Sequence, residues 1–260
     1  MIILAKLFAE ERRKKILELL QSDQRVSVKE LSKMFDVSEA TLRADLSILE
    51  EGGLLTRTHG GAVLTQEILP EFSFSEREKR NRDLKVNIAT KAAELVYDGD
   101  CILIDASSTV LELARILKNK QIRLTVVTNG ISAAMELKEN PGITVILLGG
   151  VLRVGSVALE GQLGTTILEK INISKMFTSA SGFTLEDGLT DFNVYEVELK
   201  KAMVQSVSKV IALLDNTKLG KRSLATFCEF DNIDILITNS DAPKEFLDQL
   251  KNKQTQVLLA

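Results

Sequence analysis

The stretch "VSVKELSKMFDVSEATLRADLSILE", residues 26–50, contains two short helical patterns separated by a polar break. Ser27 stands at the expected N-cap of the first helix, and Glu30 three residues later completes a capping box. The apolar positions of this helix are Val28, Leu31, Met34 and Phe35. The second helix begins after Ser38, and its expected core positions are Leu42, Leu46 and Leu49. Two short helices joined by "FDVS" predict a helix-turn-helix, in which the second helix enters the major groove of DNA.

A third amphipathic helix is expected before this pair, over residues 9–20. Its apolar stripe consists of Ile16, Leu17, Leu19 and Leu20. The basic run "RRKK", residues 12–15, is expected to lie on the opposite, exposed side.

The stretch "RTHGGAV", residues 57–63, contains His59, the single histidine among 260 residues. Gly60 and Gly61 separate two short apolar runs, residues 54–59 and 62–64, and so predict a hairpin whose tight turn uses positive φ angles. A helix-turn-helix followed by a hairpin is a winged helix. His59 has no neighbours in sequence that would orient a catalytic base or complete a metal site, so it is expected to contact DNA or to pack beside the turn.

Polar and small residues at the start of each of the two helices of the helix-turn-helix and on the hairpin are the candidates for DNA contact. They are Ser27, Ser38, Glu39, Ala40, Thr41, Arg43, Ala44, Arg57, His59, Gly60 and Gly61. Residues 1–65 hold ten basic and ten acidic residues, so a strongly basic footprint is missing. A solvated face with some charge is therefore the alternative interpretation of these residues.

Composition places the chain among globular proteins of the cytoplasm. Hydrophobic residues make up 45% and aromatic residues 5%, which is typical of helices that cover a buried sheet. The apolar opening "MIILA" is too short to span a membrane. The two cysteines are far apart and lack a partner motif, which favours a reduced compartment. No motif predicts a metal ion or a cofactor.

The sequence predicts a linker over residues 66–80 and a second domain over residues 81–260. A helix is expected over residues 77–96, and its six basic residues between positions 77 and 91 are expected to form a solvated face, with DNA contact as the alternative. Strands are then expected at "CILID", "LTVVTN", "ITVILLGG", "KMFTSA", "KVIALLD", "DILITN" and "TQVLLA". Helices are expected at residues 109–117, 132–138, 163–170, 193–206 and 243–251. This alternation predicts a mostly parallel sheet covered on both faces, in an α/β fold.

Ligands of such sheets bind beyond the carboxyl ends of the strands. The stretch "DASST", residues 105–109, follows one strand and leads into a helix, so its hydroxyls and backbone N–H groups could surround an anion such as phosphate. A simple capping loop is the alternative. Lys218 is the cation expected beside this anion, although it could equally be solvated. No P-loop or dinucleotide-binding motif is present.

Residues 12–63 closely resemble the DNA-binding domain of the DeoR family of bacterial transcriptional regulators, through "VSEATLRADL" and "RTHGGA". The family usually has a second arginine where Ala44 stands. The second domain resembles the sensor domain of the same family over nearly its whole length, through "DASSTV", "VVTNG", "VILLGGVLR", "VALEGQLG", "GFTLEDGLT", "EVELKKAMV" and "LLDNTKLG". That domain is similar in fold to ribose-5-phosphate isomerase and coenzyme A transferases.

The resemblance implies a DNA-binding regulator, expected to be a repressor of a sugar-metabolism operon, that binds an operator in double-stranded DNA. It also implies a phosphorylated sugar or related effector and a homo-oligomer, dimer or tetramer. By position, the effector site would comprise Asp105, Ser107, Ser108, Thr109, Asn129, Gly149, Gly150, Glu160, Gly161 and Lys218. The family often has glycine where Ser107 stands.

An enzyme remains the alternative: a sugar-phosphate isomerase or transferase fused to a DNA-binding domain. Its acid or base groups would come from Asp105, Glu196, Glu198, Asp215 and Lys218. Because an N-terminal DNA-binding domain needs a sensor more than a catalyst, we expect a regulator and no enzymatic activity.

Overall fold

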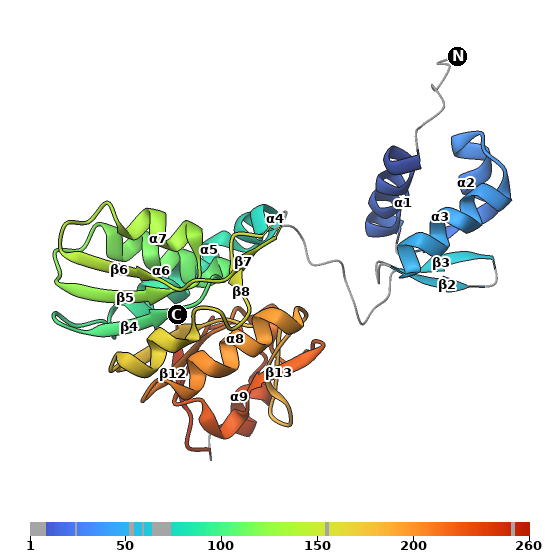
Figure 1. The fold of residues 1–260 in the computed structure, drawn as a ribbon. Helices are drawn as coiled ribbons and strands as arrows, with labels where there is room; N and C mark the ends of the chain where they lie inside the picture. The colour runs from blue at the N-terminus through green and yellow to red at the C-terminus, as the bar shows by residue number, and fades with distance from the viewer. Residues whose placement is uncertain are drawn as a thin grey trace. The chain divides into compact units, whose positions relative to one another are not determined.

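A computed structural model describes residues 9–23, 25–51, 55–58, 60–63, 74–153, 156–250 and 253–260. The chain forms two compact units, Met1–Phe72 and Ser73–Ala260, which we call the N-terminal and C-terminal units (Figure 1). His59 and residues 66–73 of the expected linker lie outside the described residues.

The N-terminal unit is a winged helix-turn-helix, as predicted. Its elements are α1 (Ala9–Asp23), β1 (Arg25–Ser27), α2 (Val28–Phe35), α3 (Glu39–Glu51), β2 (Thr56–Thr58) and β3 (Gly61–Val63). The strands form a small antiparallel sheet in the order β1-β3-β2. The expected core positions Leu42, Leu46 and Leu49 are all buried, together with Ile16 and Leu20 of α1.

Capping residues set the ends of α2. The Ser27 hydroxyl accepts a hydrogen bond from the backbone N–H of Glu30 at 3.1 Å, which confirms Ser27 as the N-cap. Asp36 then adopts a left-handed conformation with φ of 51°, and this ends the helix. Only residues 36–38 separate α2 from α3, so the two helices are joined as a helix-turn-helix requires.

Two expectations for side chains of this unit were wrong. Arg12, expected on the exposed side of α1, is buried and donates to Asp45 of α3 at 2.5 Å. A buried guanidinium needs such a partner because unpaired charge is expensive to desolvate. Met34, expected on the apolar face of α2, is 48% exposed, because the buried stripe runs through Val28, Leu31 and Phe35.

Gly61 lies inside strand β3, where we had expected it to form the tight turn with Gly60. It pairs with Thr58 on one side and with Ser27 on the other. A Cβ atom at Gly61 would lie 1.9 Å from the Val26 carbonyl oxygen, so close approach of three strands requires glycine here. Strand β1 was not predicted, because three residues between two helices carry no clear alternation.

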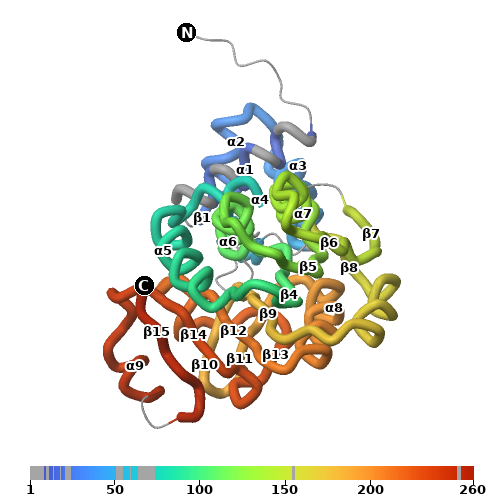
Figure 2. The backbone as a smooth tube through the Cα atoms, turned by 90° about the vertical axis from the view of Figure 1, so that its left-hand side faces the viewer, coloured from blue at the N-terminus to red at the C-terminus, as the bar shows by residue number. Residues whose placement is uncertain are grey.

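The C-terminal unit is built on a parallel sheet. Its seven strands in the described residues are β4 (Cys101–Ile104), β5 (Leu124–Thr128), β6 (Ile143–Leu147), β9 (Lys175–Thr178), β12 (Val210–Leu213), β14 (Ile235–Thr238) and β15 (Gln256–Leu259). They lie in the order β15-β14-β12-β9-β4-β5-β6, and every neighbouring pair is parallel (Figure 2). All seven correspond to the strands expected from the sequence.

Helices cover both faces of this sheet. One face packs against α5 (Arg82–Ala93), α6 (Ser108–Lys118) and α7 (Ile131–Leu137). The other packs against η1 (Thr165–Lys170), α8 (Val194–Gln205), η3 (Phe230–Asn232) and α9 (Lys244–Leu250). The segment expected as a helix over residues 163–170 is a 3₁₀ helix, η1, that begins two residues later. The short η2 (Asn216–Lys218) follows β12.

The structure adds elements that were not expected. Strands β10 (Gly182–Thr184), β11 (Gly188–Asp191) and β13 (Ala225–Cys228) form a second, antiparallel sheet, and β7 (Val151–Leu152) pairs with β8 (Leu159–Glu160). Residues 77–96 were expected to form one helix, but α4 (Phe74–Lys79) and α5 are separate, because Asn81 takes a left-handed conformation with φ of 53°. Phe74 is buried in the core of the C-terminal unit, so this part of the expected linker 66–80 packs with that unit.

Among the described residues, the structure contains no helix long and apolar enough to cross a membrane. Cys101 is half-buried, Cys228 is buried, and both are free thiols.

Candidate functional site

The start of α3 presents an exposed face of small and polar side chains. Ser38 caps the helix by accepting from the N–H of Thr41 at 3.1 Å. Glu39, Ala40, Arg43 and Ala44 are exposed, and Thr41 is half-buried. The Arg43 guanidinium donates to Glu39 one turn earlier at 2.9 Å, within an exposed pair. Exposed pairs of this kind are weak, so Arg43 can exchange Glu39 for a nucleic-acid acceptor at little cost.

The wing strand β2 is attached to the end of α3. Arg57 donates its backbone N–H to Glu50 at 2.9 Å and its guanidinium to Ser47 at 3.1 Å. On the other side, the N–H of Val28 donates to the Gly60 carbonyl at 2.9 Å. The wing is thus fixed to both helices of the helix-turn-helix, and its arginine is held beside α3.

In the C-terminal unit, the loop after β4 leads directly into α6. Ser107 is the N-cap: its hydroxyl accepts from the N–H of Val110 at 3.3 Å. Ser108 and Thr109 are buried, and no acceptor for their backbone N–H groups is found among the described residues. A helix start with free N–H groups attracts an anion. The loop therefore acts both as a cap, through Ser107, and as a potential anion site.

Lys85 of α5 lies against the same helix start. It is 4% exposed, and its ammonium donates to the Ser108 hydroxyl at 3.0 Å and to the Arg77 carbonyl. Among the described residues, no carboxylate lies within ion-pair distance of it. Burial lowers the pKa of Lys85 to about 8, although Asp215 partly opposes this effect. The expectation of a solvated basic face on this segment was therefore wrong for Lys85.

Two more cations lie within electrostatic reach of Lys85. Lys218 and Arg77 both act to lower the pKa of Lys85, after the larger effect of burial. Lys218 is half-buried at the end of η2, beside Asp215, which caps η2 by accepting from the N–H of Thr217 at 3.0 Å. Three cations, Lys85, Lys218 and Arg77, therefore interact near the start of α6, together with the carboxylates of Asp215 and Glu112.

A second group of candidate residues gathers around the β7–β8 hairpin. Asn129, which follows β5, donates its side-chain N–H to the Leu159 carbonyl at 3.1 Å, while its buried Oδ1 has no partner among the described residues. Glu160 is buried, accepts from Asn193 at 2.8 Å and forms an ion pair with Arg153 at 3.0 Å. The remaining candidates in this group are Gly149, Gly150 and Gly161.

The glycines of this group allow close packing of the backbone. A Cβ atom at Gly150 would lie 2.6 Å from the Glu160 carbonyl oxygen. Gly149 approaches Gly164 closely, and Gly161 has a φ of +82°, which other residues rarely adopt. These glycines shape the hairpin that carries Glu160.

Backbone packing brings the two groups together. Thr128 of β5 pairs with Ile104 of β4, so the loops that follow these strands are neighbours. A Cβ atom at Gly130 would lie 3.0 Å from the Cα atom of Ala106. The structure thus brings Asn129 close to the "DASST" loop at the carboxyl end of the sheet.

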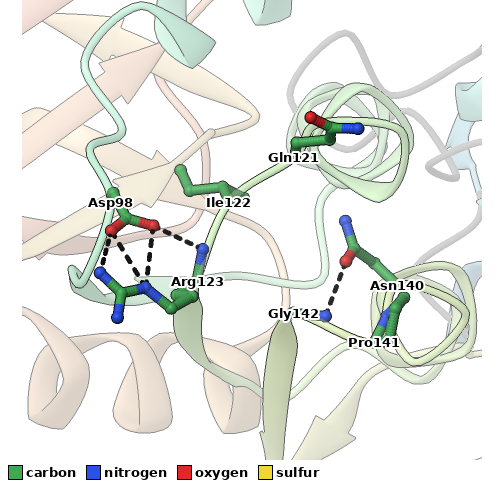
Figure 3. A pocket seen from close by; sticks show the side chains of 7 residues that line it. All are labelled: Asp98, Gln121, Ile122, Arg123, Asn140, Pro141 and Gly142. Atoms are coloured by element: carbon green, nitrogen blue, oxygen red, sulfur yellow. Dashed lines mark hydrogen bonds and ion pairs between the residues drawn. The ribbon is translucent and has the colours of Figure 1, made fainter.

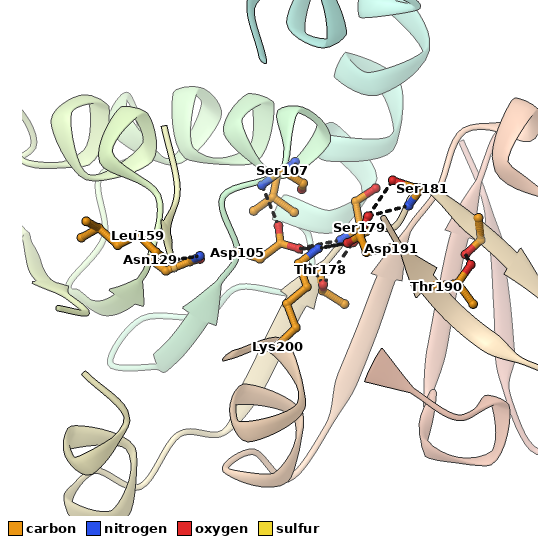
Figure 4. Close-up of polar contacts among 12 residues, drawn as sticks. Asp105, Ser107, Asn129, Leu159, Thr178, Ser179, Ser181, Thr190, Asp191 and Lys200 are labelled. Carbon is orange, nitrogen blue, oxygen red and sulfur yellow. Dashed lines mark hydrogen bonds and ion pairs between the residues drawn. The ribbon is translucent and has the colours of Figure 1, made fainter. Parts of the chain in front are cut away.

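Asp105 belongs to a buried polar network (Figure 4). Its carboxylate accepts from the N–H of Ser107 at 3.0 Å, the Thr178 hydroxyl at 2.7 Å and the N–H of Ser179 at 3.1 Å. Burial opposes its ionisation, but the Lys200 charge and these hydrogen bonds together hold the pKa of Asp105 below its usual value. Asp105 is therefore an anchored, ionised carboxylate that positions the loop.

Lys200 of α8 joins Asp105 to Asp191 of β11. Its ammonium lies 3.0 Å from Asp105 and 2.6 Å from Asp191, and it donates to the Ser179 carbonyl at 2.9 Å (Figure 4). Burial disfavours its charge, but the neighbouring carboxylates outweigh burial and raise the pKa of Lys200. Asp191 also accepts from the Ser181 hydroxyl at 2.6 Å. This network connects the main sheet to the small antiparallel sheet.

Glu196, in the first turn of α8, lies between these groups. Burial raises the pKa of Glu196 to about 7, an effect that Lys200 and Arg77 oppose and that Asp191 and Glu160 reinforce. Glu198, by contrast, is exposed and bonded to Lys201 at 3.1 Å. Of the two α8 carboxylates considered for acid–base chemistry, Glu196 alone is close to the candidate site.

A cavity of about 350 Å³ lies at the opposite, amino end of the strands, before β5 and β6 (Figure 3). Three of its polar side chains are bonded within the protein: Asp98 bonds to Arg123 at 2.5 Å, and Asn140 donates to three carbonyl oxygens. This cavity contains none of the predicted effector residues.

Comparison with known proteins identifies the family. Residues 12–67 match the model of the DeoR-like helix-turn-helix domain, and residues 80–240 match that of the DeoR C-terminal sensor domain. The chain belongs to the DeoR family of transcriptional regulators. It binds DNA through the helix-turn-helix domain, and its sensor domain is of the kind that binds a small-molecule effector.

Relatives of this DeoR-family regulator match it almost end to end. The HTH-type transcriptional regulator GolR of Listeria innocua is 44% identical over 98% of this chain and 100% of its own. The HTH-type transcriptional repressor GlcR of Bacillus subtilis is 34% identical, with 97% of each chain covered. The lactose phosphotransferase system repressor of Lactococcus lactis is 31% identical over 94% of this chain and 96% of its own.

Among solved structures, ribose 5-phosphate isomerase A from Methanocaldococcus jannaschii matches 54% of this chain and 55% of its own, with a TM-score of 0.40 and 20% identity.

The sequence interpretation of this DeoR-family regulator missed two buried lysines of the sensor domain. Lys200 is three residues from both Val197 and Met203, which are buried. Lys85 precedes the buried Ile88 by three residues. Helical spacing thus placed each lysine on an apolar stripe, and that was the available signal for burial.

Proposed function

We propose that this regulator represses genes of sugar metabolism and that a phosphorylated sugar modulates its affinity for the operator. The effector would bind at the carboxyl end of the parallel sheet, with its phosphate at the start of α6. The observation that carries this proposal is the buried Lys85 beside the free N–H groups of Ser108 and Thr109, with no carboxylate within ion-pair distance of it among the described residues. Buried charges in proteins are normally paired, so an anionic ligand is expected here.

The residues around the β7–β8 hairpin would recognise the rest of the effector. The unpartnered Oδ1 of Asn129 and the Glu160 carboxylate are acceptors, which suit the hydroxyl groups of a sugar. Asp105 would act indirectly, since its hydrogen bonds fix the loop between β4 and α6. Gly149, Gly150 and Gly161 would shape the hairpin, and Lys218 would add positive charge near the phosphate.

DNA recognition would use the exposed start of α3 and the wing. Arg43 is the expected contact to a guanine or a phosphate, and Arg57 is the expected contact to the DNA backbone. A homo-oligomer, dimer or tetramer, in the cytoplasm would place two such units on repeated half-sites. Sedimentation at micromolar concentration tests the oligomer, and a monomer would contradict it.

The proposal is tested by thermal-shift measurements with ribose 5-phosphate, fructose 6-phosphate, glucose 6-phosphate and the corresponding free sugars. A ligand at 100 times its dissociation constant should stabilise the protein by about 2.7 kcal/mol. The phosphorylated sugar that binds should also change the affinity for DNA upstream of the neighbouring operon. If no sugar phosphate in the set alters either quantity while a free sugar does, the phosphorylated class is wrong.

Arg43→Ala tests the DNA surface. We expect it to weaken operator binding by about 1–3 kcal/mol if Arg43 reads a base, measured by gel shift at fixed salt concentration. The control is Lys201→Ala, in an exposed pair on α8 of the sensor domain. Unchanged affinity of the Arg43 variant would remove this residue from the interface.

We also propose that the sensor domain has no enzymatic activity. Asp105 is fully engaged in hydrogen bonds and an ion pair, and Glu198 is exposed and paired, which leaves them poorly suited to proton transfer. Incubation with the same sugar phosphates, followed by product analysis, is the test. Turnover would establish the enzyme instead.

A further inference from the structure

Among its contacts in the described structure, helix α4 makes three that attach it to the rest of the C-terminal unit. Phe74 is buried in the core, and the Arg77 guanidinium lies over its ring at 5.4 Å. Glu78 bonds to Arg115 of α6 at 2.5 Å. The third contact is the hydrogen bond from the Lys85 ammonium to the Arg77 carbonyl. In sequence, α4 is the first described element of the C-terminal unit and directly follows the segment that links it to the DNA-binding unit.

The hydrogen bond to the Arg77 carbonyl comes from the same Lys85 ammonium that lies at the start of α6. An ammonium group has three N–H donors. Lys85 donates one N–H to the Arg77 carbonyl and one to the Ser108 hydroxyl, and no acceptor for the third is found in the described part of the chain. Lys85 is 4% exposed, so water does not freely supply that acceptor. A buried cation with one free donor therefore lies at the helix start, where the Ser108 and Thr109 N–H groups also have no acceptor among the described residues.

We propose that Lys85 couples an anion bound at the start of α6 to the attachment of α4. This inference rests on the proposed function, because it takes the effector phosphate as that anion. The phosphate accepts the third N–H of Lys85 together with the two backbone N–H groups. The ammonium is then held in its charged form and in one place, and its hydrogen bond to the Arg77 carbonyl is strengthened. Occupation of the site thus fixes the last turn of α4.

The coupling gives the sensor domain a route to the DNA-binding unit through the backbone. Because the two interactions share one side chain, the free energy of one depends on the other, and the dependence is reciprocal. Ligand binding stabilises the attachment of α4, and loosening that attachment lowers the affinity for the ligand. Lys218, also near the start of α6, has no hydrogen bond to α4 in the described structure and would contribute charge alone.

Hydrogen exchange of the α4 amides tests this inference on the full-length protein. The probe is inorganic phosphate, added to saturation as judged by calorimetry. In the wild type, phosphate should slow exchange of the peptide covering residues 74–81 by at least about tenfold. Lys85→Met should bind phosphate at least about tenfold more weakly and, at concentrations that saturate it, show no slowing in α4.

Lys120→Met is the matched control. Lys120 also donates to two backbone carbonyls, those of Ala93 at the end of α5 and of Val96 just after it, but it lies just beyond the other end of α6. This variant should bind phosphate and slow α4 exchange like the wild type. If Lys85→Met fails to fold, Lys85→Gln takes its place, since a neutral amide can keep both existing hydrogen bonds.

The outcomes separate the two proposals. Phosphate binding without slowing of α4 in the wild type, or equal slowing in the Lys85 variant, overturns the coupling and leaves the effector site in place. Slowing that depends on Lys85, in a protein whose operator affinity responds to no sugar phosphate, supports the coupling and contradicts the proposed effector class. Absence of phosphate binding to the wild type overturns the coupling.

Discussion

Lys200 and Lys85 are both buried at the carboxyl end of the parallel sheet, yet their surroundings are opposite. Lys200 contacts two carboxylates, Asp105 and Asp191, and its pKa is raised because their attraction outweighs burial. Lys85 contacts a hydroxyl and a carbonyl, and burial lowers its pKa to about 8. Two carboxylates neutralise Lys200 within the protein, whereas Lys85 has no carboxylate within ion-pair distance among the described residues. Incomplete pairing of buried charge therefore distinguishes Lys85, the proposed binding residue, from Lys200, which supports the loop after β4.

The amino and carboxyl ends of the sheet also differ in how far their polar groups are paired. The cavity at the amino end is large enough for a small molecule, but its Asp98, Arg123 and Asn140 side chains already have partners within the protein. At the carboxyl end, Asn129 keeps a buried oxygen without a partner in the described structure. Free volume alone thus identifies a ligand site less well than unsatisfied polar groups do.

The largest expected effect is loss of stability on removing Lys200. Lys200→Met leaves Asp105 and Asp191 buried without their counter-ion, so we expect it to lower the free energy of unfolding by about 3–5 kcal/mol. Lys85→Met should change it by less than about 1 kcal/mol, because the lost hydrogen bonds are offset by removal of a desolvated charge. Urea denaturation at pH 7 measures both, and Lys201→Met, on the exposed side of α8, is the control. Equal destabilisation by the Lys200 and Lys85 variants would contradict the difference in charge pairing between the two lysines.

The next effect concerns Glu196, which adds a third carboxylate near Lys200. Its folded-state pKa of about 7 lies above the usual value, so the unfolded chain loses this proton first as the pH rises, and stability falls between about pH 4.5 and 7. Glu196→Gln should therefore be more stable than the wild type by about 1–2 kcal/mol at pH 8 and equal to it at pH 4. The control is Glu198→Gln, whose carboxylate is exposed. A pH-independent difference would show that burial does not hold the proton on Glu196.

The pH dependence of effector affinity sharpens the contrast between the lysines. With a pKa of about 8 in the free protein, the Lys85 ammonium loses its proton above pH 8, while the phosphate dianion is unchanged. Affinity should fall by about tenfold between pH 7 and pH 9, measured by calorimetry. The charged groups that act on Lys85 are Asp215, Lys218, Arg77 and Glu112.

Lys85→Arg is the matched variant for this measurement, because arginine stays charged throughout the range. We expect its affinity for the effector to be nearly constant from pH 7 to pH 9. The same slope in both proteins would assign the pH dependence to another group.

The smallest expected effects distinguish the roles of two adjacent serines, Ser107 and Ser108. Ser107→Ala removes a helix cap and should lower the free energy of unfolding by about 1 kcal/mol. Ser108→Ala removes the hydroxyl acceptor of Lys85 and should change effector affinity more than stability. Thermal unfolding with and without the sugar phosphate that binds measures both variants. A reversed pattern would mean that Ser108 acts as the cap.

The sequence predicted the seven parallel strands because each is a short, mostly apolar run and most are rich in β-branched residues. The polar loops after two of them then indicated Asp105, Ser107 and Asn129 as site candidates. The small sheet of β10, β11 and β13 was missed because its strands are short and β13 pairs with a segment some 35 residues away.

The buried lysines were missed for a related reason. Hydropathy treats lysine as exposed, and the partners that allow its burial come from distant segments, such as Asp105 and Asp191 for Lys200. Spacing shows that a lysine lies on an apolar stripe, but the fold is needed to show whether a carboxylate lies opposite it. That difference decides between a supporting and a binding role.

The most direct test of the account is the response of operator binding to the effector in two proteins. Fluorescence anisotropy of labelled DNA from upstream of the neighbouring operon would be measured with and without the sugar phosphate that stabilises the wild type. We predict that the ligand changes the operator affinity of the wild type by at least about tenfold and leaves that of Lys85→Met unchanged at the same concentration. An equal response in the two proteins would contradict the assignment of the effector site to the start of α6.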